Sequence, residues 1–315
     1  MLIFFPCRLV TTCGLRFVAG AEAPVMSDLS DLYNRLDRRV MSEAELFRYG
    51  YPRPGNAPGQ ARVGTHHGTY WKVMPGPRKH NCNRCEKIYE VDSEGWPAVR
   101  ETCKWHMQRA RNGVHPCCGL RQGGQSCQTS DYHIHCDIDP DNLTGFINTS
   151  SGAAHDRSVL ALDCEMVATT RGYEVVALTV VDHRCRPVYE TMVKPEGHVL
   201  NYNTPFSGLT AADLRGVTTT LRDVHAKLLA LMGPRTILVG HGMHNDLVWL
   251  RLLHGHIVDT NQLYPHENGW PAKSPLNFLK KRHLPPLNEG GLKCREDTVA
   301  TMMLARLKCG FKARP

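Results

Sequence analysis

The stretch Leu160-Ala-Leu-Asp-Cys-Glu-Met166 decides the fold of this chain, because two acids interrupt an otherwise apolar run. Side chains on a β-strand alternate between the two faces of a sheet, so Asp163 and Glu165 are expected to project from the same face. A strand inside a core would hold both carboxylates rigidly. The alternative is a surface strand that happens to carry acids, and the apolar neighbours disfavour it.

Two further acids stand at the edges of apolar segments later in the chain. Asp246 lies in the first turn of a helix predicted over His244–Leu253, and Asp297 lies in the first turn of one predicted over Glu296–Leu307. Taken singly, each is an acid that the helix dipole favours near an N-terminus. Together with the two strand acids they form a set of hard oxygen ligands suited to Mg²⁺ or Mn²⁺. Two such ions close together commonly drive in-line cleavage of a phosphodiester.

The order of the predicted elements after residue 158 is typical of an α/β fold. Three strands come first and alternating helices and strands follow, and the short connection at 182–187 suggests that the second and third strands form a hairpin. This order predicts a ribonuclease H-like mixed sheet flanked by helices. The predicted strands are 159–166, 175–182, 187–193, 236–240 and 257–259, and the predicted helices are 221–232, 244–253, 274–283 and 296–307.

Cysteine and histidine residues cluster ahead of this α/β region. Seven of the thirteen cysteines lie within residues 82–136, interleaved with histidines, which favours metal binding in a reducing compartment over a disulfide scaffold. A C-x₂-C-x₁₇-C-x₂-H pattern predicts one structural, four-coordinate Zn²⁺ held by Cys82, Cys85, Cys103 and His106. A less diagnostic group could complete a second zinc site, the alternative being a set of mixed core residues: Cys117, Cys118, Cys127 and His133.

From Ala161 to its C-terminus the chain resembles the DEDDh 3′→5′ exonucleases, in particular the RNA exonuclease branch that includes the GOR antigen. The matching motifs are Leu-Asp-Cys-Glu-Met (162–166), Tyr-Asn-Thr-Pro-Phe-Ser-Gly-Leu-Thr (202–210), Ile-Leu-Val-Gly-His (237–241), Asn-Asp-Leu (245–247) and Glu-Asp (296–297). The resemblance extends upstream over the cysteine-rich segment and implies a 3′→5′ exoribonuclease that acts on single-stranded RNA 3′ ends. It also implies that Phe206 and Thr210 lie in a loop that packs against the terminal nucleotide.

The resemblance further implies how the acids share two Mg²⁺ or Mn²⁺ ions. Asp163, Glu165 and Asp297 would hold the ion that activates water. Asp163 would bridge to a second ion that binds the scissile phosphate, and Asp246 would orient that ion through water. All four acids are therefore predicted to be catalytic.

One position departs from the family pattern Gly-His-x-x-x-Glu-Asp. The chain reads Gly291-Leu-Lys-Cys-Arg-Glu-Asp297, so Leu292 stands where the general base is expected, and leucine cannot accept a proton. Because positioned acid–base groups contribute typically about 10²–10⁴-fold, catalysis is expected to be attenuated, with residual activity from metal-activated water. Lys293, His241 and His244 are candidate replacements, and each is disfavoured. The lysine would be protonated, His241 is a family feature of another kind, and His244 would have to point across the site.

Composition and segment boundaries complete the expectation. A net charge of +8 and a pI near 8.9 suit a polyanionic partner, although a soluble protein that is merely basic would look the same. No apolar run approaches the roughly 18 residues that span a bilayer, so no membrane is expected. The predicted segments are a possible presequence or disordered extension (1–25), a helical segment with a Pro/Gly linker (26–77), a Cys/His zinc-binding module (78–141), a linker (142–157) and the exonuclease domain (158–312).

Two questions stay open at the level of sequence. The apolar N-terminus carries Arg8 and Arg16 and no acid before Glu22, so it is either an upstream extension, with Met26 as the start, or a mitochondrial presequence. The family resemblance favours the nucleus or nucleolus instead. The alternatives to an enzyme are a catalytically inactive RNA-binding protein of the same family and a zinc-module interaction protein whose exonuclease-like domain is a scaffold.

Overall fold

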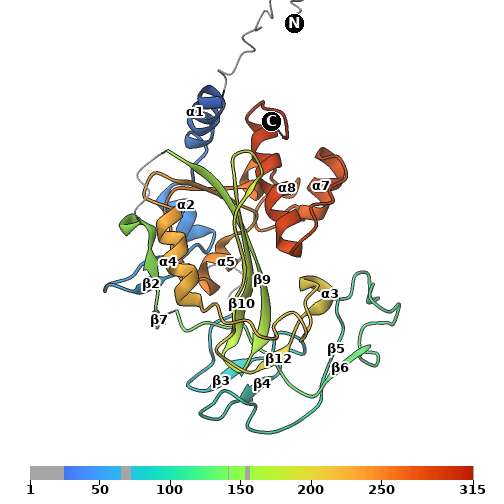
Figure 1. The fold of residues 1–315 in the computed structure, drawn as a ribbon. Helices are drawn as coiled ribbons and strands as arrows, with labels where there is room; N and C mark the ends of the chain where they lie inside the picture. The colour runs from blue at the N-terminus through green and yellow to red at the C-terminus, as the bar shows by residue number, and fades with distance from the viewer. Residues whose placement is uncertain (1–24, 65–71, 141, 153–156, 315) are drawn as a thin grey trace, which may run out of the picture.

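A computed structural model describes residues 25–64, 72–140, 142–152 and 157–314 of the chain. The predicted presequence lies almost wholly outside the described residues. Figure 1 shows an α/β body joined by the long strands β9 (Val159–Thr169) and β10 (Gly172–Asp182) to a region of short hairpins at the other end of the molecule. Within the described part of the chain, no helix is long and apolar enough to cross a membrane.

The central sheet is mixed, as predicted. Six strands form it in the order β11-β10-β9-β13-β15, with β12 paired to the far end of β9. β9, β10 and β11 are an antiparallel meander, while β13 runs parallel to both of its neighbours, β9 and β15. The remaining strand bounds are β11 Pro187–Met192, β12 Val199–Asn201, β13 Ile237–Gly240 and β15 Ile257–Asp259.

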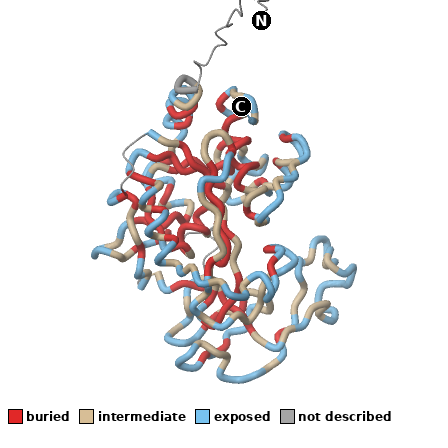
Figure 2. Tube along the Cα trace, in the orientation of Figure 1, coloured by how far each residue is buried: buried red, intermediate tan, exposed pale blue. Residues whose placement is uncertain are grey.

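Helices cover both faces of this sheet. α8 (Lys293–Lys308) and α7 (Leu276–His283) pack on one face, and α4 (Leu221–Leu231) and α5 (His244–Trp249) pack on the other. α4 begins at a capping box in which Thr220 and the third helical residue satisfy each other's backbone amides. Figure 2 shows that the buried residues are concentrated in this α/β body and along β9 and β10.

The alternation of β9 decides on which side the acids lie. Val159 and Ala161 belong to the core beneath α8, whereas Leu160 and Leu162 belong to the core beneath α4. Since side chains two apart share a face, Asp163 projects from the α8 side. The expected placement of two acids on one buried strand is therefore compatible with a site between β9 and the start of α8.

The helix predicted over 244–253 is too long. α5 ends at Trp249 because Arg251 adopts a left-handed backbone conformation with φ +50°, which an α-helix cannot continue. The two residues that follow form β14 (Leu252–Leu253), which pairs in parallel with β8 (Ile147–Asn148). Apolar periodicity alone could not separate this short buried strand from one more helical turn.

Segments expected as linkers pack against the α/β body. β1 (Arg53–Pro54) and β2 (Gln60–Arg62) form a three-stranded sheet with β7 (Leu143–Thr144), and the 3₁₀ turn Thr149–Ser151 follows β8. Within the supposed Pro/Gly linker Tyr51 is fully buried, and its hydroxyl donates to Asp259 Oδ2 at 2.7 Å. A buried aromatic ring with a bonded hydroxyl explains why this segment is ordered.

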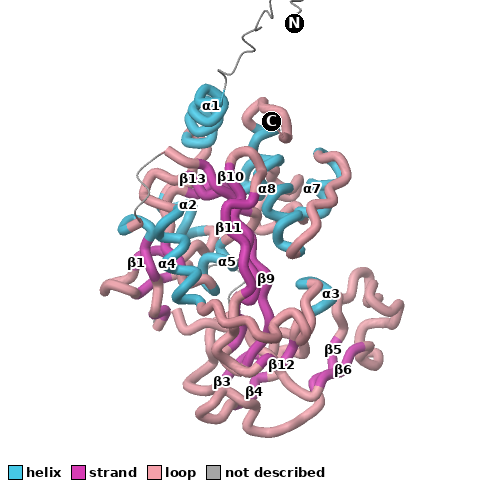
Figure 3. Tube along the Cα trace, in the orientation of Figure 1, coloured by secondary structure: helices cyan, strands magenta, loops and turns pink. Residues whose placement is uncertain are grey.

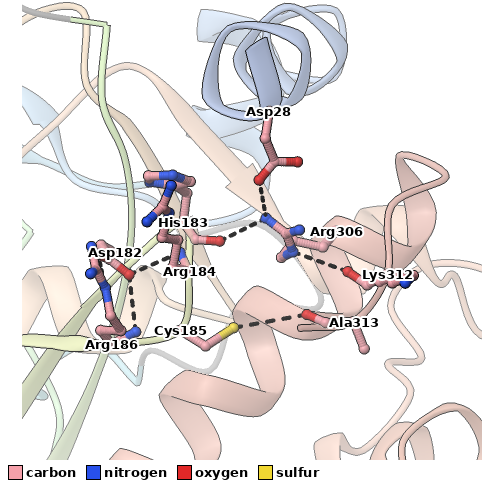
Figure 4. A network of polar contacts seen from close by, with 9 residues as sticks. All are labelled: Asp28, Asp182, His183, Arg184, Cys185, Arg186, Arg306, Lys312 and Ala313. Atoms are coloured by element: carbon pink, nitrogen blue, oxygen red, sulfur yellow. Dashed lines mark hydrogen bonds and ion pairs between the residues drawn. The ribbon is translucent and has the colours of Figure 1, made fainter. Parts of the chain in front are cut away.

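The first N-terminal helix is tied to the far end of α8, whereas the second packs in the core beneath α4. α1 (Val25–Asp37) packs against the α8 core, and α2 (Glu43–Arg48) starts at the capping Ser42 that its sequence predicts. Figure 4 shows Arg306 of α8 at the centre of the contact, with Nη1 donating to Asp28 Oδ2 at 3.3 Å and to the His183 carbonyl at 2.9 Å. Its Nε donates to the Lys312 carbonyl at 3.0 Å.

The Cys/His module is made mostly of loops, as Figure 3 shows. Its regular structure is two hairpins, β3 (Lys79–Asn81) with β4 (Ile88–Glu90) and β5 (Cys103–Trp105) with β6 (Gln128–Ser130). Two of the four residues in its small buried core are cysteines. So small an apolar core is typical of modules that depend on side-chain ligation of a metal, which stays a prediction for this one.

Candidate active site

Three elements bring the predicted acids together. Asp163 and Glu165 come from β9, Asp246 from the first turn of α5, and Asp297 from the N-terminal part of α8. The backbone amide of Cys164 donates to Asp246 Oδ1 at 3.2 Å, which ties α5 directly to β9 between the two strand acids.

A tight turn after β13 positions Asp246. A Cβ atom on Gly240 would lie 2.4 Å from Cβ of Met243, and Gly242 has φ +65°, so side chains at these two positions would obstruct or strain the turn. The Gly242 amide donates to Asp259 Oδ1 at 3.0 Å, the same carboxylate that Tyr51 binds. The segment expected as a linker thus supports the turn that carries a predicted catalytic acid.

Burial and mutual repulsion act on the acids. Burial is the main reason that the pKa of Asp163 is raised well above its usual value, and the charges of Asp246, Asp297 and Glu165 add to it. Burial likewise raises the pKa of Glu165 to about 7 and that of Asp246 to about 7. Asp246 is buried, whereas the other three keep partial access to solvent. Crowded oxygen ligands that are costly to ionise without a counter-charge fit a divalent cation such as Mg²⁺ or Mn²⁺.

Two lysines lie beside the acids. Lys280 of α7 donates to Asp297 Oδ1 at 2.8 Å and to Glu296 Oε1 at 2.5 Å, and its side chain is only 16% exposed. The charge of Lys293, the first residue of α8, lowers the pKa of both strand acids against the larger effect of burial. The sequence reading missed Lys280, although its spacing from Leu276 and Leu279 places it on the inner face of α7.

Among the residues that the structure describes, none stands ready as a general base in place of the expected histidine. Leu292 is the residue before α8, and its side chain packs against an apolar cluster that includes Leu209. His241 Nδ1 lies 2.8 Å from Thr260 Oγ1, and burial lowers the pKa of His241. His244 is buried next to Lys273, and burial, followed by that positive charge, holds the pKa of His244 well below its usual value.

A cavity of about 390 Å³ opens beside the acids. Glu165, Asp246 and His241 line one part of it, and Cys136 of the Cys/His module and Tyr173 of β10 line another. Its walls therefore come from both regions of the molecule.

The two predicted substrate contacts lie near this cavity but differ in setting. Phe206 is in the short helix α3 (Thr204–Ser207), is 56% exposed, and lines the neighbouring groove described below. Thr210 is turned toward its own loop, where its hydroxyl donates to Asp213 Oδ2 at 2.7 Å. Contact of either residue with a nucleotide stays a prediction.

The cysteines form two four-ligand groups, but the histidines are exchanged relative to the prediction. His133, not His106, joins the first group, whose ligand atoms lie close together: Cys82, Cys85, Cys103 and His133. The second group is His106, Cys117, Cys118 and Cys127. Cys85 Sγ is 3.3 Å from His133 Nδ1, and Cys118 Sγ is 3.4 Å from His106 Nδ1.

The register of the β5–β6 hairpin explains the exchange. Cys103 pairs with Ser130 and Trp105 pairs with Gln128, so the next residue, His106, is directed toward Cys127. A Cys and a His three residues apart on an extended strand are separated by about 10 Å, too far to bind one ion. His133 follows Ser130 and so returns to the end of the hairpin where Cys103 lies. Occupation of both groups by Zn²⁺ remains a prediction.

A third polar cluster escaped the sequence reading. His80 Nδ1 lies 2.7 Å from Asp137 Oδ1, His135 Nδ1 lies 3.2 Å from the same oxygen, and the two imidazole rings stack at 3.5 Å. The alternation of His135 and Asp137 on an extended segment was the available signal. The ligand atoms of these three side chains lie within 4.8 Å of one another, so this group could also hold a metal ion, and it connects β3 to the end of the module.

Comparisons with known proteins place the chain in an exonuclease family. No protein-family model matches it. It is 36% identical over 301 residues to the RNA exonuclease 1 homolog of Homo sapiens, covering 90% of this chain and 24% of that protein. It is 35% identical over 320 residues to exonuclease GOR of Pan troglodytes, covering 95% of this chain and 45% of that protein. The chain thus spans between about a quarter and a half of the length of these relatives.

The identity to both relatives extends over nine-tenths of this chain or more. Among solved structures, the Pan2 catalytic unit of Neurospora crassa, containing protease and nuclease domains, is similar with a TM-score of 0.42 and 19% identity. That similarity covers 51% of this chain and 30% of the Pan2 chain.

Proposed function

We propose that this protein is a metal-dependent 3′→5′ exoribonuclease whose catalysis is attenuated. The observation that carries the proposal is the convergence of four carboxylates from β9, α5 and α8, two of which line one cavity, with the pKa of three of the four raised. RNA as the substrate is supported by the name of the human relative. The 3′→5′ direction and the two-ion arrangement rest on the family resemblance.

The residues would divide the work as follows. The four acids would hold the divalent ions, and bound ions would supply the charge that activates water and stabilises the leaving oxygen. Glu165 and Asp246 line the cavity in which the 3′-terminal nucleotide would lie. The Cys164 amide keeps the Asp246 carboxylate aligned with β9. Leu292 cannot take the proton of the attacking water, so that proton must leave without a positioned base, and the rate falls.

A catalytically inactive RNA-binding or scaffold protein of the same family is the second candidate. Two observations favour it: the apolar packing of Leu292 and the hold of Lys280 on Asp297. Both features lower the expected catalytic rate and leave the shape of the site unchanged.

Hydrolysis of 5′-labelled single-stranded RNA with Mg²⁺ or Mn²⁺ separates the two candidates. We expect a slow ladder that shortens from the 3′ end with the native chain and no product with Asp163→Asn. Glu267→Gln is the matched control, because Glu267 is an exposed acid outside the cluster. If the native chain binds RNA but yields no more product than Asp163→Asn, the inactive protein is the correct description.

We also propose nuclear or nucleolar localisation, from the family resemblance, with mitochondria as the alternative. Imaging the chain with and without residues 1–25 tests this, because only a mitochondrial presequence would make the location depend on that segment.

A further inference from the structure

A second cavity, of about 510 Å³, lies between the Cys/His module and the loop that carries α3. It adjoins the cavity beside the acids, because Cys136, Tyr173 and Asn203 line both. Together the two cavities form a path that starts at the carboxylates and passes between β10 and the module. We call the second cavity the module groove.

Arg84 lines this groove, and one nitrogen of its guanidinium group lacks a hydrogen-bond acceptor among the described residues. Its guanidinium carbon lies 4.3 Å from the ring centroid of Trp105. Its Nη1 is buried and has no hydrogen-bond partner among the described residues, and over that same part of the chain no carboxylate forms an ion pair with Arg84. A buried, unpaired donor is costly, so a phosphate oxygen that accepted from it would gain a charge-assisted hydrogen bond.

The rest of the groove suits an unpaired nucleic-acid strand. Lys72 and Arg109 add positive charge, and Glu86, the acid in the lining, already pairs with them at 3.7 Å and 3.1 Å. Phe206 on the opposite wall exposes 56% of its surface and offers a ring face. Cations that follow a backbone, combined with aromatic rings on which bases stack, are how proteins bind single strands with little sequence preference.

We propose that the module groove binds the single-stranded RNA that lies 5′ of the nucleotide at the acidic site, with Arg84 on a backbone phosphate and Phe206 stacked on a base of this segment, and not on the terminal nucleotide to which the family resemblance assigns it. This inference rests on the proposed function for the direction of the strand. The Cys/His module then sets the length of RNA that the protein grips, while the carboxylates act on the last nucleotide.

Binding as a function of RNA length tests the proposal. Fluorescence anisotropy with a 5′-labelled dinucleotide and octanucleotide would be measured in the Asp163→Asn background, so that RNA is not consumed. We expect the octanucleotide to bind more tightly than the dinucleotide. Arg84→Gln and Phe206→Ala should each weaken octanucleotide binding by about tenfold, because the first loses a charge-assisted hydrogen bond to a phosphate and the second loses a stacked base.

The arginine variant and the phenylalanine variant each have a matched control. Arg100 also lies over an aromatic ring of the module, Tyr132, but outside the groove, and Phe278 is an exposed phenylalanine on α7. Arg100→Gln and Phe278→Ala should leave octanucleotide affinity unchanged. Because Arg84 neighbours a predicted zinc ligand, zinc content is measured for Arg84→Gln, and Phe206→Ala provides the independent variant remote from those ligands.

Two results would overturn the proposal that the module groove binds RNA. One is octanucleotide affinity in both groove variants equal to that of the controls. The other is an equal loss for dinucleotide and octanucleotide, which would place both residues at the acidic cavity. This binding measurement does not depend on hydrolysis. If no exonuclease ladder appeared, the proposed function would be wrong, but the dependence of affinity on RNA length would still test RNA binding in the groove.

Discussion

Substitution of Leu292 alone tests whether the missing general base attenuates catalysis. Leu292→His should raise the hydrolysis rate by about 10²–10⁴-fold, because it restores a proton acceptor at the position where the family carries one. It should also lower stability by about 1–3 kcal/mol, because a polar ring enters an apolar cluster. Single-turnover hydrolysis and thermal unfolding measure the two effects.

Leu292→Gln is the control for that substitution, since glutamine is polar but is not a base. It should lose similar stability and gain no rate. Equal rates for the histidine and glutamine variants would show that the missing base does not limit this protein, and the attenuation would need another cause.

A second prediction at the scale of one residue concerns Lys280. Its ammonium group occupies an oxygen of Asp297 that a divalent cation would need. Lys280→Met should therefore tighten Mn²⁺ binding by about tenfold, because the ion no longer displaces a salt bridge and the acids are left with more uncompensated negative charge. Calorimetric titration measures the change.

Lys281→Met removes an exposed lysine from the same helix and should leave Mn²⁺ affinity unaltered apart from a small general charge effect. Weaker Mn²⁺ binding in Lys280→Met than in Lys281→Met would contradict the competition and would mean that Lys280 holds Asp297 in its binding position.

The β5–β6 hairpin carries the prediction at the scale of elements. If its register sets the ligand groups, Cys82→Ser and His133→Ala disrupt the same zinc site, and each should lose about one zinc ion after dialysis against a chelator. Their double variant should also lose about one, whereas Cys82→Ser with His106→Ala should lose about two. Zinc content by atomic emission decides between the pairings.

In the opposite pattern, Cys82→Ser with His106→Ala loses one zinc ion and Cys82→Ser with His133→Ala loses two. That result would support the ligand pairing predicted from the sequence. The comparison is internal, because all variants remove ligands from one small module.

Local patterns predicted the elements better than the contacts between them. The apolar run around Asp163 and the helical pattern over residues 221–232 each specify structure within a few neighbouring residues, and each element formed as expected. The exchange of His106 and His133 could not be read in that way, because it depends on which strand residues face each other. Strand register is fixed by pairing between distant segments, and spacing along one strand does not reveal it.

At the scale of the whole molecule, the predicted segments support one another through contacts that their sequences do not indicate. Tyr51, expected in a linker, holds Asp259 beneath the turn that carries Asp246. Cys136, expected only as part of a cysteine-rich module, lines the cavity beside the acids. Both relations join segments far apart in sequence, which composition and periodicity do not report.

Arg306 tests whether the catalytic end of α8 depends on packing at its other end. Arg306→Met should lower the free energy of unfolding by about 3 kcal/mol, because the carbonyls of His183 and Lys312 and the carboxylate of Asp28 lose their donor. Asp28→Asn removes only the negative charge of a partner that is 24% exposed and keeps an acceptor oxygen, so it should cost less than Arg306→Met. Denaturant unfolding measures both.

Hydrolysis by Arg306→Met at a temperature where it is fully folded should match that of the native chain. Arg306 lies about 14 Å along the α8 axis from Asp297, so a local loss of contacts at one end leaves the acids in place. If stability is unchanged, the buried guanidinium contributes nothing to the fold. If activity falls in the folded protein, the packing of α1 and the C-terminus helps to position Asp297, and α8 couples the two ends of the molecule.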